Sequence, residues 1–77
     1  MCYFTAMSRD VRTRFGKKIR QLRTQRGLSQ MQLAERVGMA AAFLSRVEAG
    51  EKEPCLGTIQ ALSEGLKVPL RRIFWDL

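Results

Sequence analysis

The chain has 77 residues, a hydrophobic fraction of 45% with only 8% aromatics, and a formal net charge of +7. This length supports one small core, which excludes a multi-domain enzyme with a separate cofactor lobe. No run approaches the ~18 apolar residues of a membrane span, and residues 1–6 lack the pattern of a secretory signal. We therefore expect no membrane association and a cytoplasmic location.

The positive charge is concentrated near the start of the sequence. Eight basic residues and one acid lie between Arg9 and Arg26, so this segment carries the entire net charge. Such a field attracts a polyanion, most often nucleic acid or anionic lipid. The alternative is an ordinary solvated helix with an excess of lysine and arginine.

The residue types that are missing exclude most catalytic chemistry. The chain has no histidine, and Cys2 and Cys55 are its only cysteines, so neither a zinc site nor a histidine-activated nucleophile can be assembled. No glycine-rich phosphate motif or pair of acids suited to hydrolysis occurs. The sequence predicts a non-enzymatic protein without metal, cofactor or small-molecule ligand. The two cysteines could form a disulfide bond, but the reducing interior of a cell favours free thiols.

Helical periodicity predicts a first helix over Val11–Gln25, ended by Gly27. Its apolar stripe consists of Val11, Phe15, Ile19 and Leu22. Residues 1–8 are expected to form an N-terminal arm, and residues 9–77 a single domain.

Ser29 begins a second helix with complete capping signals. Its hydroxyl can accept from the N–H of Gln32, and the Gln32 side chain can reach back to the Ser29 N–H. Leu28 and Leu33 form the matching hydrophobic staple, and Gly38 ends the helix.

A third helix is predicted over Ala41–Ala49, ended by Gly50. Only Gly38-Met39-Ala40 separates it from the second helix, so the two must cross steeply, as in a helix-turn-helix.

Two further helices complete the pattern. Pro54 precedes a fourth helix with an apolar face of Leu56, Ile59, Leu62 and Leu66. Gly57 and Gly65 lower its helix propensity by about 1 kcal/mol each, so frayed ends are expected. Pro69 opens a final short helix over Leu70–Asp76. The sequence therefore predicts an all-α fold of five helices.

One block within this pattern is specific. Leu28-Ser29-Gln30, Leu33-Ala34, Gly38 and Glu48-Ala49-Gly50 resemble the Cro/CI-type (XRE, lambda-repressor-like) helix-turn-helix proteins, over a stretch from Val11 to Phe74. The resemblance implies a compact lambda-repressor-like domain, usually a homodimer. It also implies that the third helix enters the major groove of double-stranded DNA.

Several residues become candidates for contacts to the DNA backbone. The family's second helix contacts the backbone at its amino end, which implies phosphate contacts by Ser29 and Gln30. A helix N-terminus suits a phosphate because it has free N–H groups and partial positive charge. Ser29 as a capping residue alone is the alternative. Further phosphate candidates are Lys17, Lys18 and Lys52.

The third helix is expected to read bases. Its candidate readers, opposite the core-facing Leu44 and Val47, are Ala41, Ala42, Ser45 and Arg46. The alanine methyls can contact thymine methyls, and Arg46 can bind a guanine in bidentate fashion. Many relatives have polar side chains at the two alanines and Ser or Thr at Ala40. The alternative for Arg46 is a solvated surface residue or a phosphate contact.

The resemblance also implies an inward ion pair between Arg23 and Glu48. Each lies beside an apolar stripe of its helix, so we expect a structural role, and removal of one partner should cost several kcal/mol.

The C-terminal segment concentrates large apolar side chains. We expect Leu70, Ile73, Phe74 and Trp75 to form a dimer interface. In the alternative, Ile73 and Phe74 close the core of the monomer and leave Trp75 half-exposed.

These observations favour a dimeric, sequence-specific DNA-binding regulator of transcription, similar to a phage repressor or a restriction–modification controller. An antitoxin-like protein-interaction module on the same fold is the alternative. A membrane-active basic helix fits the helix-turn-helix pattern poorly.

Overall fold

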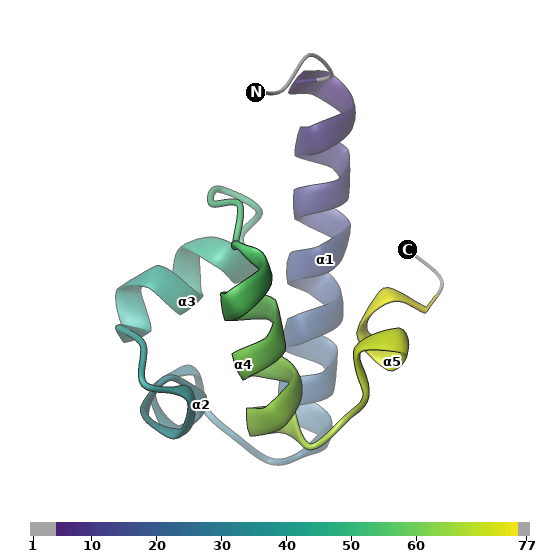
Figure 1. The fold of residues 1–77 in the computed structure, drawn as a ribbon. Coiled ribbons are helices and arrows are strands. Elements are labelled where there is room, and N and C mark those ends of the chain that lie inside the picture. The colour runs from purple at the N-terminus through teal and green to yellow at the C-terminus, as the bar shows by residue number, and fades with distance from the viewer. Residues whose placement is uncertain (1–4, 76–77) are drawn as a thin grey trace.

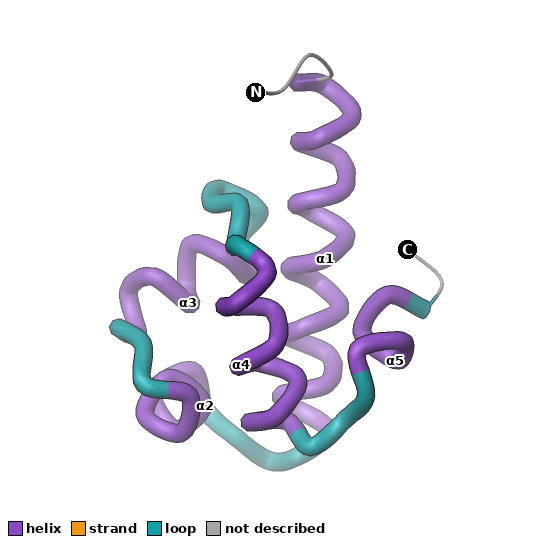
Figure 2. Tube along the Cα trace, in the orientation of Figure 1, coloured by secondary structure: helices purple, strands orange, loops and turns teal. Residues whose placement is uncertain are grey.

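The computed structural model describes residues 5–75, with side chains from Val11 to Trp75. Its helices are α1 (Thr5–Gln25), α2 (Gln30–Val37), α3 (Ala41–Glu48), α4 (Leu56–Leu66) and α5 (Leu70–Phe74). In Figure 1, α2 and α3 lie to the left of α4, α5 lies to its right, and α1 runs behind. Helices and short loops make up the whole described part, without a strand (Figure 2). The prediction of an all-α, five-helix fold is therefore confirmed.

The first helix is longer than its apolar stripe predicts. It begins at Thr5 rather than Val11, so four residues of the expected N-terminal arm are helical. Residues 5–10 contain neither glycine nor proline, and nothing in their sequence stops the helix from continuing upstream of the stripe. The first turns of α1 consequently extend beyond the other helices (Figure 1). The expectations for residues 1–4, including Cys2, and for residues 76–77 lie outside the described residues.

The core is a single cluster to which all five helices contribute. Its buried apolar members are Phe15, Ile19, Leu22, Leu33, Ala34, Leu44, Val47, Leu62, Leu66, Val68 and Ile73. Val11 continues the α1 stripe by one more turn but is 52% exposed, because the core ends below it. Phe15 meets the Phe74 ring at a centroid distance of 6.0 Å, which attaches α5 to α1.

The ends of α2 follow the predicted capping pattern. The Gln32 N–H donates to the Ser29 hydroxyl at 3.0 Å, and the Ser29 N–H donates to the Gln32 side-chain oxygen at 2.8 Å. Gly38 ends the helix at φ 75°, the left-handed conformation that glycine adopts without strain. Leu28 packs against the core cluster that contains Leu33. The N-terminus of α3 differs, because Ala40 has no side-chain oxygen to cap it.

One expectation for α4 is wrong, and one of its glycines has a packing role that the sequence did not predict. Leu56 is 82% exposed, because the buried residues of α4 all belong to its second half. Gly65 is buried within the helix, where a Cβ atom would collide with Cγ1 of Val37. This glycine therefore permits the close packing of α4 on α2. The final helix also ends earlier than predicted, at Phe74.

Candidate nucleic-acid interface

The position of α3 is set by a close crossing with α1 at Gly16. A Cβ atom on this residue would lie 2.5 Å from the carbonyl oxygens of both Val47 and Glu48. Only glycine therefore allows the last turn of α3 to approach α1 so closely. The sequence analysis included Gly16 in no site, since a glycine inside a helix does not by itself show which neighbour it meets.

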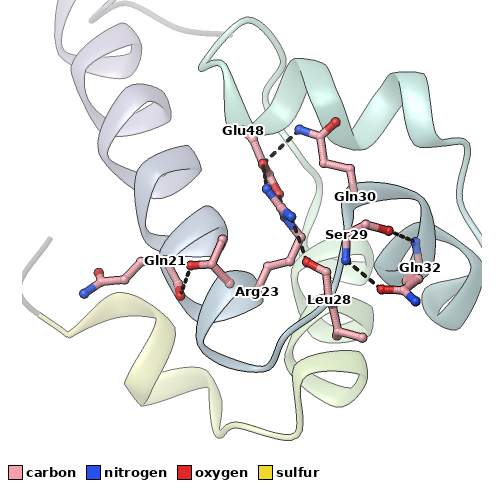
Figure 3. Close-up of polar contacts among 8 residues, drawn as sticks. Gln21, Arg23, Leu28, Ser29, Gln30, Gln32 and Glu48 are labelled. Atoms are coloured by element: carbon pink, nitrogen blue, oxygen red, sulfur yellow. Dashed lines mark hydrogen bonds and ion pairs between the residues drawn. The ribbon is translucent and has the colours of Figure 1, made fainter.

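A buried ion pair holds the same end of α3. Arg23 donates from Nε to Oε2 of Glu48 at 2.7 Å and from Nη2 to Oε1 at 3.0 Å. A third guanidinium nitrogen, Nη1, donates to the carbonyl oxygen of Leu28 at 2.8 Å (Figure 3). The side chains of the pair are 11% and 3% exposed, respectively. The inward pairing expected from the sequence is present, and it links α1, α3 and the loop before α2.

Gln30 belongs to this network, which the sequence analysis missed. Its side-chain amide donates to Oε1 of Glu48 at 3.0 Å, so the first residue of α2 is bonded to the last residue of α3 (Figure 3). Gln30 therefore has a structural role in addition to the phosphate contact expected from the sequence. One amide hydrogen positions the two helices, and only the second is available for DNA.

The outward side of α3 carries small and polar residues around one arginine. Ala42, Ser45, Arg46 and Ala49 are exposed, whereas Leu44 and Val47 on the inward side are buried. The expectation that Ala41 belongs to this outward side is corrected, because Ala41 is partly buried and packs against the core cluster. The methyl-lined surface next to Arg46 therefore consists mainly of Ala42 and Ala49.

The candidate phosphate residues are distributed unevenly around this surface. Ser29 and Lys52 are exposed, and the hydroxyl of Ser29 accepts the capping bond described above. At about 100° per residue, Lys17 lies to the side of the α1 face that meets α3. Lys18 lies about 160° around α1 from Gly16, on the side away from α3. The structure therefore does not bring Lys18 to the recognition surface.

Other chemistry has little support in the described part of the chain. Residues 11–75 contain no group of three metal-ligating side chains. None of the described helices has the length and hydrophobicity needed to cross a bilayer. Cys55 is an exposed free thiol 3.3 Å from the hydroxyl of Thr58. Hydrogen bonding to this hydroxyl, and then to the Thr58 backbone, lowers the pKa of the thiol.

Comparison with known proteins agrees with this geometry. A family model described as Helix-turn-helix (HTH_3) matches residues 19–73, which include α2, the turn and α3. The chain belongs to this helix-turn-helix family of DNA-binding transcriptional regulators.

The relatives of this helix-turn-helix chain include repressors and small controllers. It is 40% identical over 62 residues to the HTH-type transcriptional repressor RghR of Bacillus subtilis, covering 79% of this chain and 46% of RghR. It is 30% identical over 69 residues to the control protein C.MunI of a Mycoplasma species, covering 88% of this chain and 93% of C.MunI. The chain thus spans less than half of RghR but almost all of C.MunI.

A solved structure has the same fold as this helix-turn-helix domain. The restriction–modification controller protein C.AhdI from Aeromonas hydrophila superimposes with a TM-score of 0.83 at 34% sequence identity. The match covers 84% of this chain and 98% of C.AhdI.

Proposed function

We propose that this chain binds a specific DNA operator as a homodimer, with α3 in the major groove, and thereby regulates transcription. The observation that carries the proposal is the exposed side of α3, whose opposite side is fixed by the Gly16 crossing and the Arg23–Glu48 pair. A major groove admits an α-helix, and a helix held rigidly in the fold can present its side chains to base edges at defined positions.

Arg46 is the principal base reader in this proposal. It is exposed in the last turn of α3, and an arginine can donate two parallel hydrogen bonds to O6 and N7 of guanine. Ala42 lets the helix approach the groove floor closely and can contact a thymine methyl. Ser45 can bond to either kind of base.

The N-terminus of α2 supplies the backbone contacts beside the groove. Its first N–H groups lack partners within the helix and carry partial positive charge, which favours a phosphate. Gln30 adds its second amide hydrogen there. Lys17 and Lys52 add cationic charge around the site, although exposed Glu51 and Glu53 flank Lys52.

Exposed apolar residues of α5 support the homodimer. Leu70 and Phe74 are each 45% exposed and Trp75 is 72% exposed, which leaves an apolar surface uncovered in the monomer. The expectation that Ile73 belongs to the dimer interface is corrected, because this residue is fully buried in the core of its own chain. For both α3 helices to reach successive major grooves, a symmetric contact through the other three must place them about 34 Å apart, one DNA turn.

Selection of bound duplexes from a random DNA pool, at a stated salt concentration, tests the proposal. We expect enrichment of a pseudo-palindromic site whose half-sites are centred about 10 base pairs apart. An unenriched pool, together with specific retention of a partner protein, would instead support the antitoxin-like interaction module.

The variant Arg46→Ala tests the assignment of the reader. It should lose about 1–3 kcal/mol of preference for the selected site over random DNA, because the bidentate guanine contact is gone. The melting temperature should stay unchanged, since the side chain is exposed. As a control of equal charge, Lys17→Ala should weaken binding to both duplexes alike. Unchanged preference in Arg46→Ala would remove Arg46 from this role.

A further inference from the structure

Arg12 in α1 is a partly buried arginine with an unsatisfied donor. Its Nε atom is buried and has no hydrogen-bond partner within the described residues. An ionised guanidinium has five N–H donors, and a buried donor without an acceptor destabilises the folded state. Any acceptor that reaches Nε would therefore stabilise the protein.

The position of Arg12 indicates where that acceptor would be. At about 100° per residue, Arg12, Gly16 and Arg23 fall within about 40° of one another on α1. Gly16 lies against the carbonyl groups at the end of α3, and the neighbouring Thr13 lies against Gly50. Arg12 is thus one turn beyond the crossing, at the C-terminal end of α3, where Arg46 is exposed.

The comparison with Arg23 shows what Arg12 lacks. Both arginines are on the α1 face that meets α3, but Arg23 has a carboxylate and a carbonyl oxygen as acceptors. The loop after α3 carries exposed Glu51 and Glu53, and among the described residues no ion pair joins either of them to Arg12. Lys52 stands between these two acids, which offset part of its charge and weaken its contribution to phosphate binding.

We propose that Arg12 binds a DNA phosphate at the C-terminal end of α3, a contact that rests on the function proposed above. The N-terminus of α2 lies beside the last residue of α3, where Gln30 bonds to Glu48, and Arg12 lies on α1 one turn beyond the Gly16 crossing. Rotation of the flexible side chain toward DNA uncovers Nε and gives it a charged acceptor. A guanidinium suits this role because two of its N–H groups can bind one phosphate together.

The test measures the salt dependence of DNA binding for the parent chain, Arg12→Ala and Lys18→Ala. Lys18 is the matched control, because it is also partly buried on α1 but lies on the side away from α3. The probes are the duplex selected from the random pool and a 30-base-pair duplex of random sequence. In Arg12→Ala we expect the slope of log K against log salt to fall by about 0.9 per protomer, and in Lys18→Ala we expect no change.

A melting curve of each variant separates DNA binding from folding. Arg12→Ala should melt at or above the temperature of the parent, since it removes a buried unpaired donor. An unchanged slope, an equal fall in both variants, or a lower melting temperature with an unchanged slope would overturn the assignment. A parent chain that binds neither duplex would overturn the proposed function itself, an outcome visible before any variant is compared.

Discussion

The first three helices and the last two follow the local rules of folding to different degrees. In the first part, α2 begins with a complete capping box and ends at Gly38 in the left-handed conformation. The buried Arg23–Glu48 ion pair has further hydrogen-bond partners in Leu28 and Gln30. In the second part, the N-cap residues Cys55 and Pro69 have no side-chain oxygen that could cap the helix. Lys67 occupies a left-handed position, and Leu56 and Trp75 are largely exposed.

This difference agrees with the role of each part in the proposed function. The first part determines the angle at which α3 is presented, and a small error there would displace every side chain that faces the groove. The second part closes the core and offers an apolar surface, for which the orientation of single groups matters less. Substitutions in the first part should therefore mostly destabilise, whereas the second part should contain positions that can be improved.

The largest effect is expected for Glu48→Ala. Removing this carboxylate leaves the Arg23 charge buried without its partner and also removes the acceptor of Gln30. The free energy of unfolding, measured by urea denaturation, should fall by about 3–5 kcal/mol.

Two controls accompany this variant. Glu64→Ala removes an exposed acid from α4 and should change stability by less than about 0.5 kcal/mol. The double variant Arg23→Met with Glu48→Met should recover most of the loss, because no buried charge remains. A loss below about 1 kcal/mol in Glu48→Ala would show that water satisfies Arg23, contrary to its burial.

Gly16→Ala should have the second-largest effect. The new methyl group would collide with two backbone carbonyl groups of α3, and backbone can move only if the helices separate. Overpacking of this kind typically costs about 1–3 kcal/mol, and the rigid neighbours place this site at the upper end. Gly57→Ala is the matched control, since a methyl there would meet only Cys55 Sγ, at an ordinary contact distance of 4.0 Å, and should stabilise the exposed helix. Equal stability of the two variants would contradict the close crossing.

The helices and their caps could be predicted because their signals are local. The capping box at Ser29 and the stop at Gly38 each depend on residues within a few positions of one another. The pairing of Arg23 with Glu48 is a long-range contact, and it was expected because a family resemblance supplied the partner. The place and the inward direction of the pair are as expected.

The remaining features depend on how the helices cross, which periodicity does not specify. The apolar stripes predict that Val11 and Leu56 face inward, but each lies on a turn that extends beyond its neighbours. The bond from Gln30 to Glu48 needs the ends of α2 and α3 to meet at hydrogen-bond distance. Likewise, the sequence shows only that Gly65 has a low helix propensity, whereas its contact with Val37 appears only in the structure.

The N-terminus of α3 is the exception within the first part, and Ala40→Ser tests it. Ala40 has φ −70° and ψ 138°, the extended conformation in which a serine hydroxyl can accept from the first turn of a helix. The substitution should raise the free energy of unfolding by about 1 kcal/mol, measured by urea denaturation. Ser29→Ala should lose about the same amount at α2, where the capping bond exists. No gain in Ala40→Ser would show that the exposed cap is already satisfied by water.

The smallest effect, and a gain, is expected for Lys67→Gly at the end of α4. Lys67 has φ 59° and ψ 43°, a left-handed conformation that costs an ordinary residue about 1–2 kcal/mol. Glycine avoids that cost but loses about 0.5–1 kcal/mol through the greater freedom of the unfolded chain, so the net gain should be about 0.5–1 kcal/mol. Gly38→Ala is the reverse substitution. An added Cβ at Gly38 would meet no atom within 4 Å, so only the backbone strain at φ 75° changes. It should lose a similar amount in the same denaturation measurement. If both substitutions were neutral, the contrast between the two parts of the chain would not extend to their helix ends.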